Sequence, residues 1–239
     1  MKNPLKKFLA AAVFLLTSLL MNAAEPTTGD EPKPAIELAV PSFLTGEAYR
    51  DGLCLCSPEK GIRQQAVERL IHYLDTAGQF NAILVVGLLQ GLQSDEPDLD
   101  AAQSRIVDCL REVATAAEGK AVDLVVEPVN HLQVGFNNTV AEVRELARRV
   151  GSPALRPMVD TIHMNIEEKS LTQPIRDLGP ALRHVHLCES NAGPLGSGRV
   201  DFGSVVRALE SIEYLDFASV KIYRGTNMRE DAKSAASYL

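Results

Sequence analysis

The fold of this 239-residue chain is decided by the stretch Arg156-Pro-Met-Val-Asp160-Thr-Ile-His163-Met-Asn165-Ile-Glu167-Glu168, a short apolar run that stops at an acid, an imidazole and two further carboxylates. A buried parallel strand ends in this way when its carboxyl end carries chemistry. Similar strand ends flank it, Leu124-Val-Val-Glu127-Pro-Val-Asn130 and His184-Val-His186-Leu-Cys188-Glu189. Because the carboxyl ends of parallel strands meet on one rim, we expect the side chains of Glu127, Asp160 and His186 to meet there.

The segments between these strands are long enough for one helix each, which predicts an α/β protein. Six strands are expected, each but the last followed by a helix, and they begin near Ile36, Ile83, Leu124, Met158, His184 and Ala218. A complete (β/α)8 barrel has eight strands in about 250 residues. We therefore predict a (β/α) TIM-type barrel truncated to six βα units, with the first two strands missing. Two unpaired edges predict an open barrel or a homo-oligomer.

Helix-start signals support this division of the chain. Ser57-Pro-Glu predicts a helix that runs to about Ala77, and Asp100 is expected to cap the next one. Thr139-Val-Ala-Glu142 is a capping-box signature, and Asp201 is expected to open a helix over residues 202–212.

The N-terminus has the layout of a signal peptide, predicted at residues 1–24. Three lysines precede an apolar run from Phe8 to Leu20, which is shorter than the ~20 residues that span a bilayer. An uncleaved membrane anchor is the alternative. A linker at residues 25–34 and one domain at 35–239 follow. We expect export without membrane attachment after cleavage, or a cytoplasmic protein if the first residues are an artefact of the gene start.

Composition and charge exclude some partners. With 24 basic against 31 acidic residues, a net charge of −7 and no Trp, the chain offers no basic stripe for nucleic acid. Four cysteines occur, at positions 54, 56, 109 and 188, and a chain of this size does not need disulfides to fold. We expect buried thiols. A zinc knuckle is not expected, because the Cys54-x-Cys56 pair lacks a matching second pair.

The polar residues at the strand ends also have simpler interpretations. Glu127 is held extended by the following proline, and it is either a pocket carboxylate or a solvated strand-end acid. Asp160 and His163 either take part in a metal or substrate site or belong to the start of the next helix. Glu167 and Glu168 are typical of a solvated helix segment.

Three motifs together carry a resemblance to a known family: Glu127-Pro-Val-Asn130, Val159-Asp-Thr-Ile-His-Met-Asn-Ile-Glu-Glu168, and His184-Val-His-Leu-Cys-Glu-Ser-Asn191 followed by Gly196-Ser-Gly198. They resemble the sugar isomerase and epimerase family of xylose isomerase-like TIM barrels, especially the D-tagatose and D-psicose 3-epimerases. The resemblance covers roughly residues 36–223 and implies strands three to eight of that family's barrel. It also implies a small-molecule sugar as the partner.

The resemblance implies roles for individual residues. The family holds a divalent metal with a Glu, an Asp, a His and a final Glu, and the first three match Glu127, Asp160 and His186. His163 matches a residue that binds a substrate oxygen, and Asn130 and Asn191 are further substrate-binding candidates.

The chain departs from the family pattern at three positions. Lys221 stands where the fourth metal ligand is expected, Gln133 replaces a substrate-binding Glu, and Ala192 replaces a frequent Arg. Lys221 is therefore either a second proton donor or the reason for an inactive site. We expect its ammonium to pair with Glu127 and Asp160 in place of a metal.

The residue types fit ketose chemistry. Carboxylates with one imidazole suit Mn²⁺, Mg²⁺ or Co²⁺, and such an ion on adjacent ketose oxygens favours an enediolate. The sequence thus predicts a divalent-metal-dependent sugar isomerase or epimerase with Glu127 as base and Lys221 as candidate acid. The alternatives are an inactive carbohydrate-binding relative, an incomplete barrel fragment, and an endonuclease IV-type nuclease, for which five histidines are too few and the charge has the wrong sign.

Overall fold

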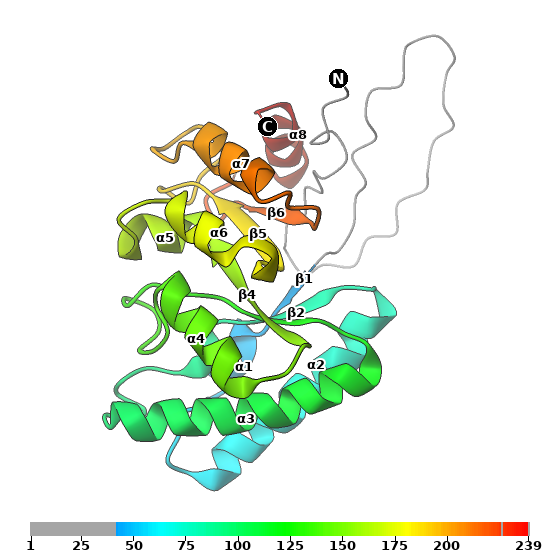
Figure 1. Ribbon diagram of the computed structural model, residues 1–239, viewed down its shortest axis with the longest axis vertical. Helices are drawn as coiled ribbons and strands as arrows, with labels where there is room; N and C mark the ends of the chain where they lie inside the picture. The colour runs from blue at the N-terminus through cyan, green and yellow to red at the C-terminus, as the bar shows by residue number, and fades with distance from the viewer. Residues whose placement is uncertain (1–41, 226, 239) are drawn as a thin grey trace.

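The computed structural model describes residues 42–225 and 227–238. In these residues, six parallel strands form one sheet in the order β1-β2-β3-β4-β5-β6. The sheet curls into a nearly closed TIM-type barrel with helices on its outside, as Figure 1 shows. Its strands are β1 (Ser42–Leu44), β2 (Ile83–Val86), β3 (Leu124–Val126), β4 (Leu155–Asp160), β5 (His184–Cys188) and β6 (Ala218–Lys221). The predicted fold class is confirmed.

Ten helices and 3-10 turns lie between and after the strands in this part of the chain. They are α1 (Gly46–Arg50), α2 (Lys60–Gln79), η2 (Leu88–Gln90), α3 (Leu99–Lys120), α4 (Val140–Val150), α5 (Thr161–Glu167), α6 (Gln173–Leu178), η3 (Gly179–Ala181), α7 (Phe202–Ser211) and α8 (Met228–Tyr238). The last of these corrects one prediction, since β6 is also followed by a helix.

The N-terminal predictions fall outside the described residues. This applies to the signal peptide, the linker and the strand at 36–40. The segment after Pro41 contains β1 and α1. β1 pairs with β2 through Ser42, Phe43 and Leu44, so it forms one edge of the sheet. β6 forms the other edge, and within residues 42–225 and 227–238 no strand ladder joins the two.

Two helix starts differ from the prediction, and the hydrogen bonds explain why. The α3 helix is capped by Asp98, whose Oδ1 accepts from the backbone N–H groups of Asp100 and Ala101. Ser57 forms a local turn by accepting from the Glu59 N–H, and α2 begins only at Lys60. The capping box of Thr139 and the cap of Asp201 are confirmed.

Side chains alternate between the two faces of each strand, so the core consists of a layer between the strands and the helices and a smaller cluster inside the barrel. Outward-facing residues such as Leu84 and Leu124 pack against α2, α3 and α4, while Val185 and Val220 pack against α6 and α7. The barrel interior holds a small apolar cluster of Ile83, Val85, Val125 and Met158. One step further along β3 and β4, the same inward face carries polar residues, because Glu127 follows Val125 and Asp160 follows Met158 by two positions.

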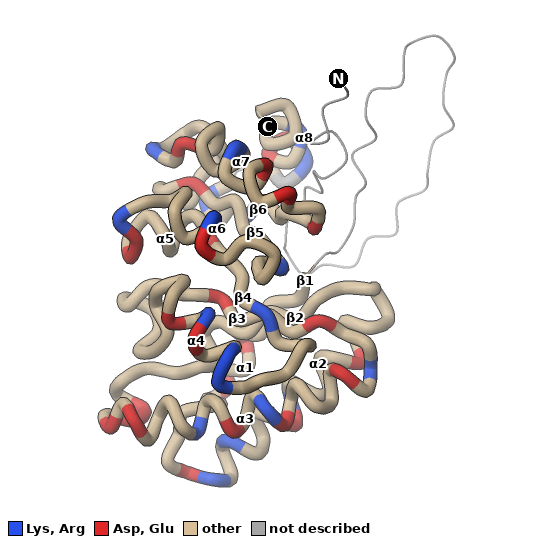
Figure 2. Tube along the Cα trace, in the orientation of Figure 1, with Lys and Arg blue, Asp and Glu red and all other residues tan. Residues whose placement is uncertain are grey.

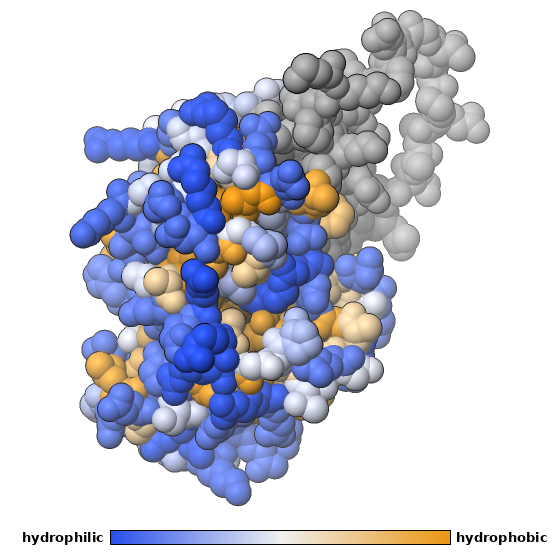
Figure 3. Space-filling model, viewed as in Figure 1, coloured by the Kyte–Doolittle hydropathy of each residue, from blue (hydrophilic) through white to orange (hydrophobic). Residues whose placement is uncertain are grey.

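The surface is polar and mixed in charge. Basic and acidic residues alternate along α2, α3 and α4 in Figure 2, so these helices present no continuous basic face. The face in Figure 3 is mainly hydrophilic, with smaller hydrophobic areas between the polar side chains. Among the described helices, none combines the length and the apolar composition that crossing a bilayer requires.

Candidate functional site

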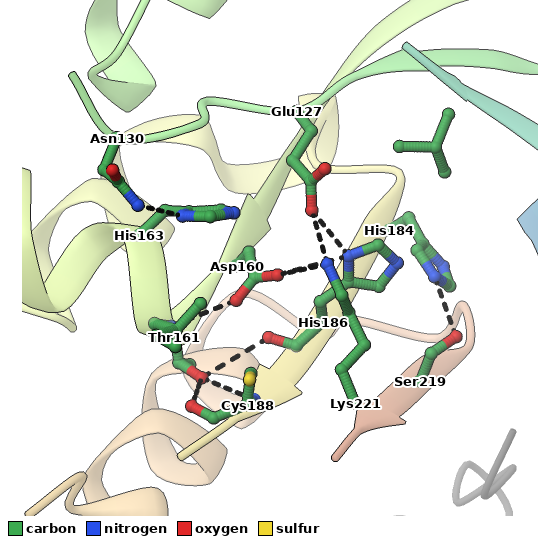
Figure 4. A network of polar contacts seen from close by, with 12 residues as sticks. Glu127, Asn130, Asp160, Thr161, His163, His184, His186, Cys188, Ser219 and Lys221 are labelled. Atoms are coloured by element: carbon green, nitrogen blue, oxygen red, sulfur yellow. Dashed lines mark hydrogen bonds and ion pairs between the residues drawn. The ribbon is translucent and has the colours of Figure 1, made fainter. Parts of the chain in front are cut away.

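The carboxyl ends of four neighbouring strands bring Glu127, Asp160, His186 and Lys221 together inside the barrel (Figure 4). Lys221 Nζ donates to Glu127 Oε1 at 3.0 Å and to Asp160 Oδ2 at 2.9 Å. His186 Nδ1 lies 2.8 Å from Glu127 Oε1 and 3.4 Å from Asp160 Oδ2. The ammonium group thus lies between the two carboxylates, as expected from the sequence.

The strand register explains this meeting. Asp160 is the last residue of β4 and pairs with His186 on β5, which in turn pairs with Ser219 on β6. Lys221 lies two positions after Ser219, on the same face of β6. Glu127 follows β3 directly, and its backbone N–H still donates to the Val86 carbonyl, which keeps it extended at the rim.

The four side chains are almost completely shielded from water. Their residues are between 0% and 8% exposed. Burial alone would raise the pKa of Glu127, but the Lys221 ammonium and the His186 ring outweigh it and lower the pKa to about 2. Burial opposes the charged form of Asp160 as well, yet Lys221 and His186 hold its pKa well below the ordinary value. Both carboxylates are therefore ionised at neutral pH.

Lys221 stays charged in this setting. Burial lowers the pKa of a lysine, but Asp160 and Glu127 reverse the effect and hold the pKa of Lys221 well above its ordinary value. The neighbouring His184 behaves differently, since burial and the nearby cationic side chains lower its pKa well below the usual range. Its Nε2 contacts Ser219 Oγ at 2.9 Å, as expected for a hydrogen-bonded interior residue.

His163 and Asn130 form a second polar pair beside this cluster. His163 lies in α5, and its Nδ1 is 2.7 Å from Asn130 Nδ2. The Asn130 oxygen accepts from the Leu132 N–H, so this amide is fixed by its own loop and orients the imidazole. Asp160 also caps α5, because its Oδ1 accepts from the Ile162 N–H. The simpler helix-start role and the site role of Asp160 therefore coexist.

A small pocket at this rim is open to solvent and has a cavity volume of about 80 Å³. Its wall includes the end of β1, the turn after β2 and the end of β6, so both edges of the sheet contribute to it. Glu127, His163 and Lys221 line it, together with Gln133. Sequence reasoning missed three further lining residues, Thr45, Gly87 and Tyr223, because none follows a recognisable strand-end motif.

Asn191 is not brought to this pocket. It is exposed on the loop after β5, and its side-chain amide donates to the Ser197 carbonyl while its oxygen accepts from the Gly193 N–H. Glu167 also lies apart from the four-residue cluster. Its carboxylate accepts a hydrogen bond from the His131 N–H.

Gly87 is predicted to be essential for the position of Glu127. A Cβ atom there would lie 2.7 Å from Glu127 Oε2 and 3.2 Å from Val129 Cγ2. We expect Gly87→Ala to displace the carboxylate and lower the free energy of unfolding by about 1–3 kcal/mol, as overpacking commonly does. Urea unfolding measures this. Gly61→Ala is the control, because nothing lies within 4 Å of a Cβ at Gly61 in α2. Equal stability of both variants would contradict the close contact.

Fold and site together define the class of protein: a parallel α/β barrel with an acidic and imidazole cluster at the carboxyl rim. Residues 38–239 match the family model described as xylose isomerase-like TIM barrel. The chain belongs to this family, which confirms the resemblance found in the sequence.

Its relatives include ketose 3-epimerases. The chain is 31% identical to an L-ribulose 3-epimerase of Mesorhizobium japonicum, over 71% of this chain and 58% of that protein. It is 32% identical to a D-psicose 3-epimerase of Ruminiclostridium cellulolyticum, over 67% and 56%. The solved structure of D-psicose 3-epimerase with D-tagatose from Clostridium cellulolyticum superposes with a TM-score of 0.71 at 26% identity, over 85% of this chain and 76% of that one. The chain thus spans less than two thirds of the length of these curated relatives.

The divalent ion implied by the family does not fit these residues while Lys221 is charged. Glu127, Asp160 and His186 each offer a ligand atom, and these atoms lie within 4.8 Å of one another. However, Lys221 Nζ already contacts the same two carboxylate oxygens that would face an ion. The ammonium is held in the space between the ligands.

Proposed function

We propose that this protein binds a small sugar of the ketose type at the barrel rim without a divalent metal. It would be a carbohydrate-binding relative of the ketose 3-epimerases in which Lys221 replaces the ion. The observation that carries the proposal is the pair of contacts from Lys221 Nζ to Glu127 and Asp160, at 3.0 and 2.9 Å.

The electrostatic argument follows from the charges. At an effective dielectric near 20, two unit charges about 4 Å apart interact by roughly 4 kcal/mol, so an ammonium beside a dication would meet on the order of 8 kcal/mol of repulsion. The carboxylates of Glu127 and Asp160 would offset part of this. These two carboxylates already pair with the Lys221 ammonium, however, so a metal ion would have to share the same two anions with it.

The pocket supplies groups suited to sugar hydroxyls. Thr45, Gln133 and His163 offer donors and acceptors, and Tyr223 adds an aromatic ring. The Lys221 ammonium lies 5.4 Å from the centre of that ring. The solved relative with D-tagatose supports a ketose as the class of ligand.

A second candidate function is metal-dependent ketose epimerisation. It is favoured by the mutual proximity of the Glu127, Asp160 and His186 ligand atoms, all within 4.8 Å. In this case Lys221 would have to move out of the cluster or lose its proton, and Glu127 and Lys221 would be the candidate base and acid. The two candidates differ in whether the wild-type protein needs an ion.

Calorimetric titration with Mn²⁺ distinguishes the two candidates. We expect no binding at the rim site of the wild type and binding by Lys221→Glu, which restores four potential ligands. Lys233→Glu is the matched control, because it makes the same charge change on the exposed side chain of α8. D-tagatose should bind the wild type equally well with and without a chelator. Tight Mn²⁺ binding by the wild type, with no gain in Lys221→Glu, would instead favour the epimerase.

A further inference from the structure

A second cluster of metal-binding groups lies outside the rim pocket, at Cys54, Cys56 and Asp95. One ligand atom from each of these residues lies within 4.8 Å of the other two. Both cysteines precede α2, whereas Asp95 lies in the loop between η2 and α3. We propose that this cluster is a zinc site that joins the two loops. The proposal is independent of the proposed sugar-binding function.

The distance between the two sulfurs fits a shared tetrahedral ion. Cys54 Sγ and Cys56 Sγ are 3.8 Å apart. Zinc–sulfur bonds of about 2.3 Å at a tetrahedral angle place two sulfurs about 3.8 Å apart, so the thiols need not separate to accept the ion. Two thiolates and one carboxylate are ordinary zinc ligands, and they leave a fourth position for water.

The carboxylate is already oriented toward the thiols. Asp95 Oδ2 accepts hydrogen bonds from the Leu92 N–H at 2.7 Å and from the Tyr49 hydroxyl at 2.9 Å. Partners of this kind fix a ligand side chain in metal sites. Tyr49 belongs to α1, so the cluster also connects this helix to the loop after β2. Tyr49 is a positioning residue for Asp95 rather than a ligand.

The backbone leaves room for the cluster at Gly91. This residue has φ +99°, and a Cβ atom there would lie 2.4 Å from Cys56 Sγ and 3.2 Å from Asp95 Oδ2. A side chain at this position would occupy the space between the thiol and the carboxylate. Cys56 is fully buried and Cys54 is 5% exposed, whereas Asp95 is half-buried. An ion can therefore enter beside Asp95.

The chemistry of binding is a simple exchange. Zn²⁺ forms one bond to each sulfur and one to a carboxylate oxygen, and each thiol that carries a proton releases it to the solvent. No oxidant is required. The resulting clip would hold the loop before α2 to the loop before α3. The rim pocket is lined by neighbouring parts of the chain, since Thr45 and Gly46 lie at the start of α1 and Gly87 precedes η2.

Cobalt substitution tests the proposal in the reduced full-length protein, since Co²⁺ bound to thiolate gives an intense near-ultraviolet charge-transfer band. Carboxylates and imidazole do not give this band, so the rim cluster cannot produce it. We expect one equivalent of Co²⁺ to generate the band and Zn²⁺ to remove it. Cys54→Ser and Cys56→Ser should each abolish it. Cys109→Ser and Cys188→Ser are the matched controls, because they remove buried free thiols elsewhere and should keep it.

Zinc affinity, measured by competition with a chromophoric chelator, provides a second readout. The variants tested in this way leave both buried thiols in place. We expect Asp95→Asn to weaken binding at least about 100-fold and Tyr49→Phe to weaken it about 10-fold. The proposal is overturned if the wild type gives no thiolate band, if the band survives in both cysteine variants, or if Asp95→Asn binds Zn²⁺ as tightly as the wild type.

Discussion

Lys221→Met is expected to lower the free energy of unfolding by about 3–5 kcal/mol at pH 7, because it removes one partner from a buried charge cluster. The ammonium of Lys221 forms ion pairs with two carboxylates, Glu127 and Asp160, that are 5% and 0% exposed. Without it, both must either stay charged in a dry interior or take up a proton. Urea unfolding in the presence of a chelator, followed by circular dichroism, measures the loss.

The same variant should recover stability when Mn²⁺ is added. With the ammonium gone, Glu127, Asp160 and His186 face an open position, and an ion at a hundredfold excess over its Kd contributes about 2.7 kcal/mol. The wild type should show no such gain. Lys233→Met is the control, since the exposed Lys233 on α8 pairs with Glu230 and takes no part in the rim cluster, and surface changes usually stay within about 0.5 kcal/mol. An unchanged stability of Lys221→Met would show that the two ion pairs contribute little.

The rim cluster could be predicted from the sequence because its information is local. Each of Glu127, Asp160 and His186 ends an apolar run, and parallel strands put such ends on one rim whatever the details of the helices. Even the pairing of Lys221 followed from one substitution in a recognised pattern. The fold class was predictable for the same reason, since the alternation of strand and helix segments limits the possible architectures.

Other parts of the molecule could not be predicted, because they depend on loop conformation. Asp95 approaches the two cysteines through a loop that turns at Gly91, and the 39 positions that separate it from Cys56 give no ligand spacing to recognise. For this reason the Cys54-x-Cys56 pair was interpreted as two buried thiols alone. Loop conformation also decides the surroundings of Asn191, because a motif position cannot reveal that its amide bonds within its own loop.

Acid should destabilise the wild type in two successive pH ranges. The pKa of His184 is held below its ordinary 6.5 by burial, so the unfolded chain binds its proton more readily and stability begins to fall below pH 6.5. The pKa of Glu127 is lowered from 4.5 to about 2, a difference of about 2.5. At 1.36 kcal/mol per pKa unit, this carboxylate contributes about 3 kcal/mol that is fully present above pH 4.5 and is lost as the pH falls toward 2.

Lys221→Met should change the loss of stability between pH 4.5 and 2 without changing the loss that begins below pH 6.5. Burial raises the pKa of a carboxylate, and Lys221 is the largest of the causes that lower the pKa values of Glu127 and Asp160. In this variant the protonation of these two carboxylates should therefore destabilise the fold much less. The stability gap between variant and wild type should therefore close as the pH falls from 4.5 toward 2, while the fall that begins near pH 6.5 remains in both. Urea unfolding at a series of pH values measures the gap. A gap that stays constant down to pH 2.5 would mean that Lys221 does not control the ionisation of Glu127.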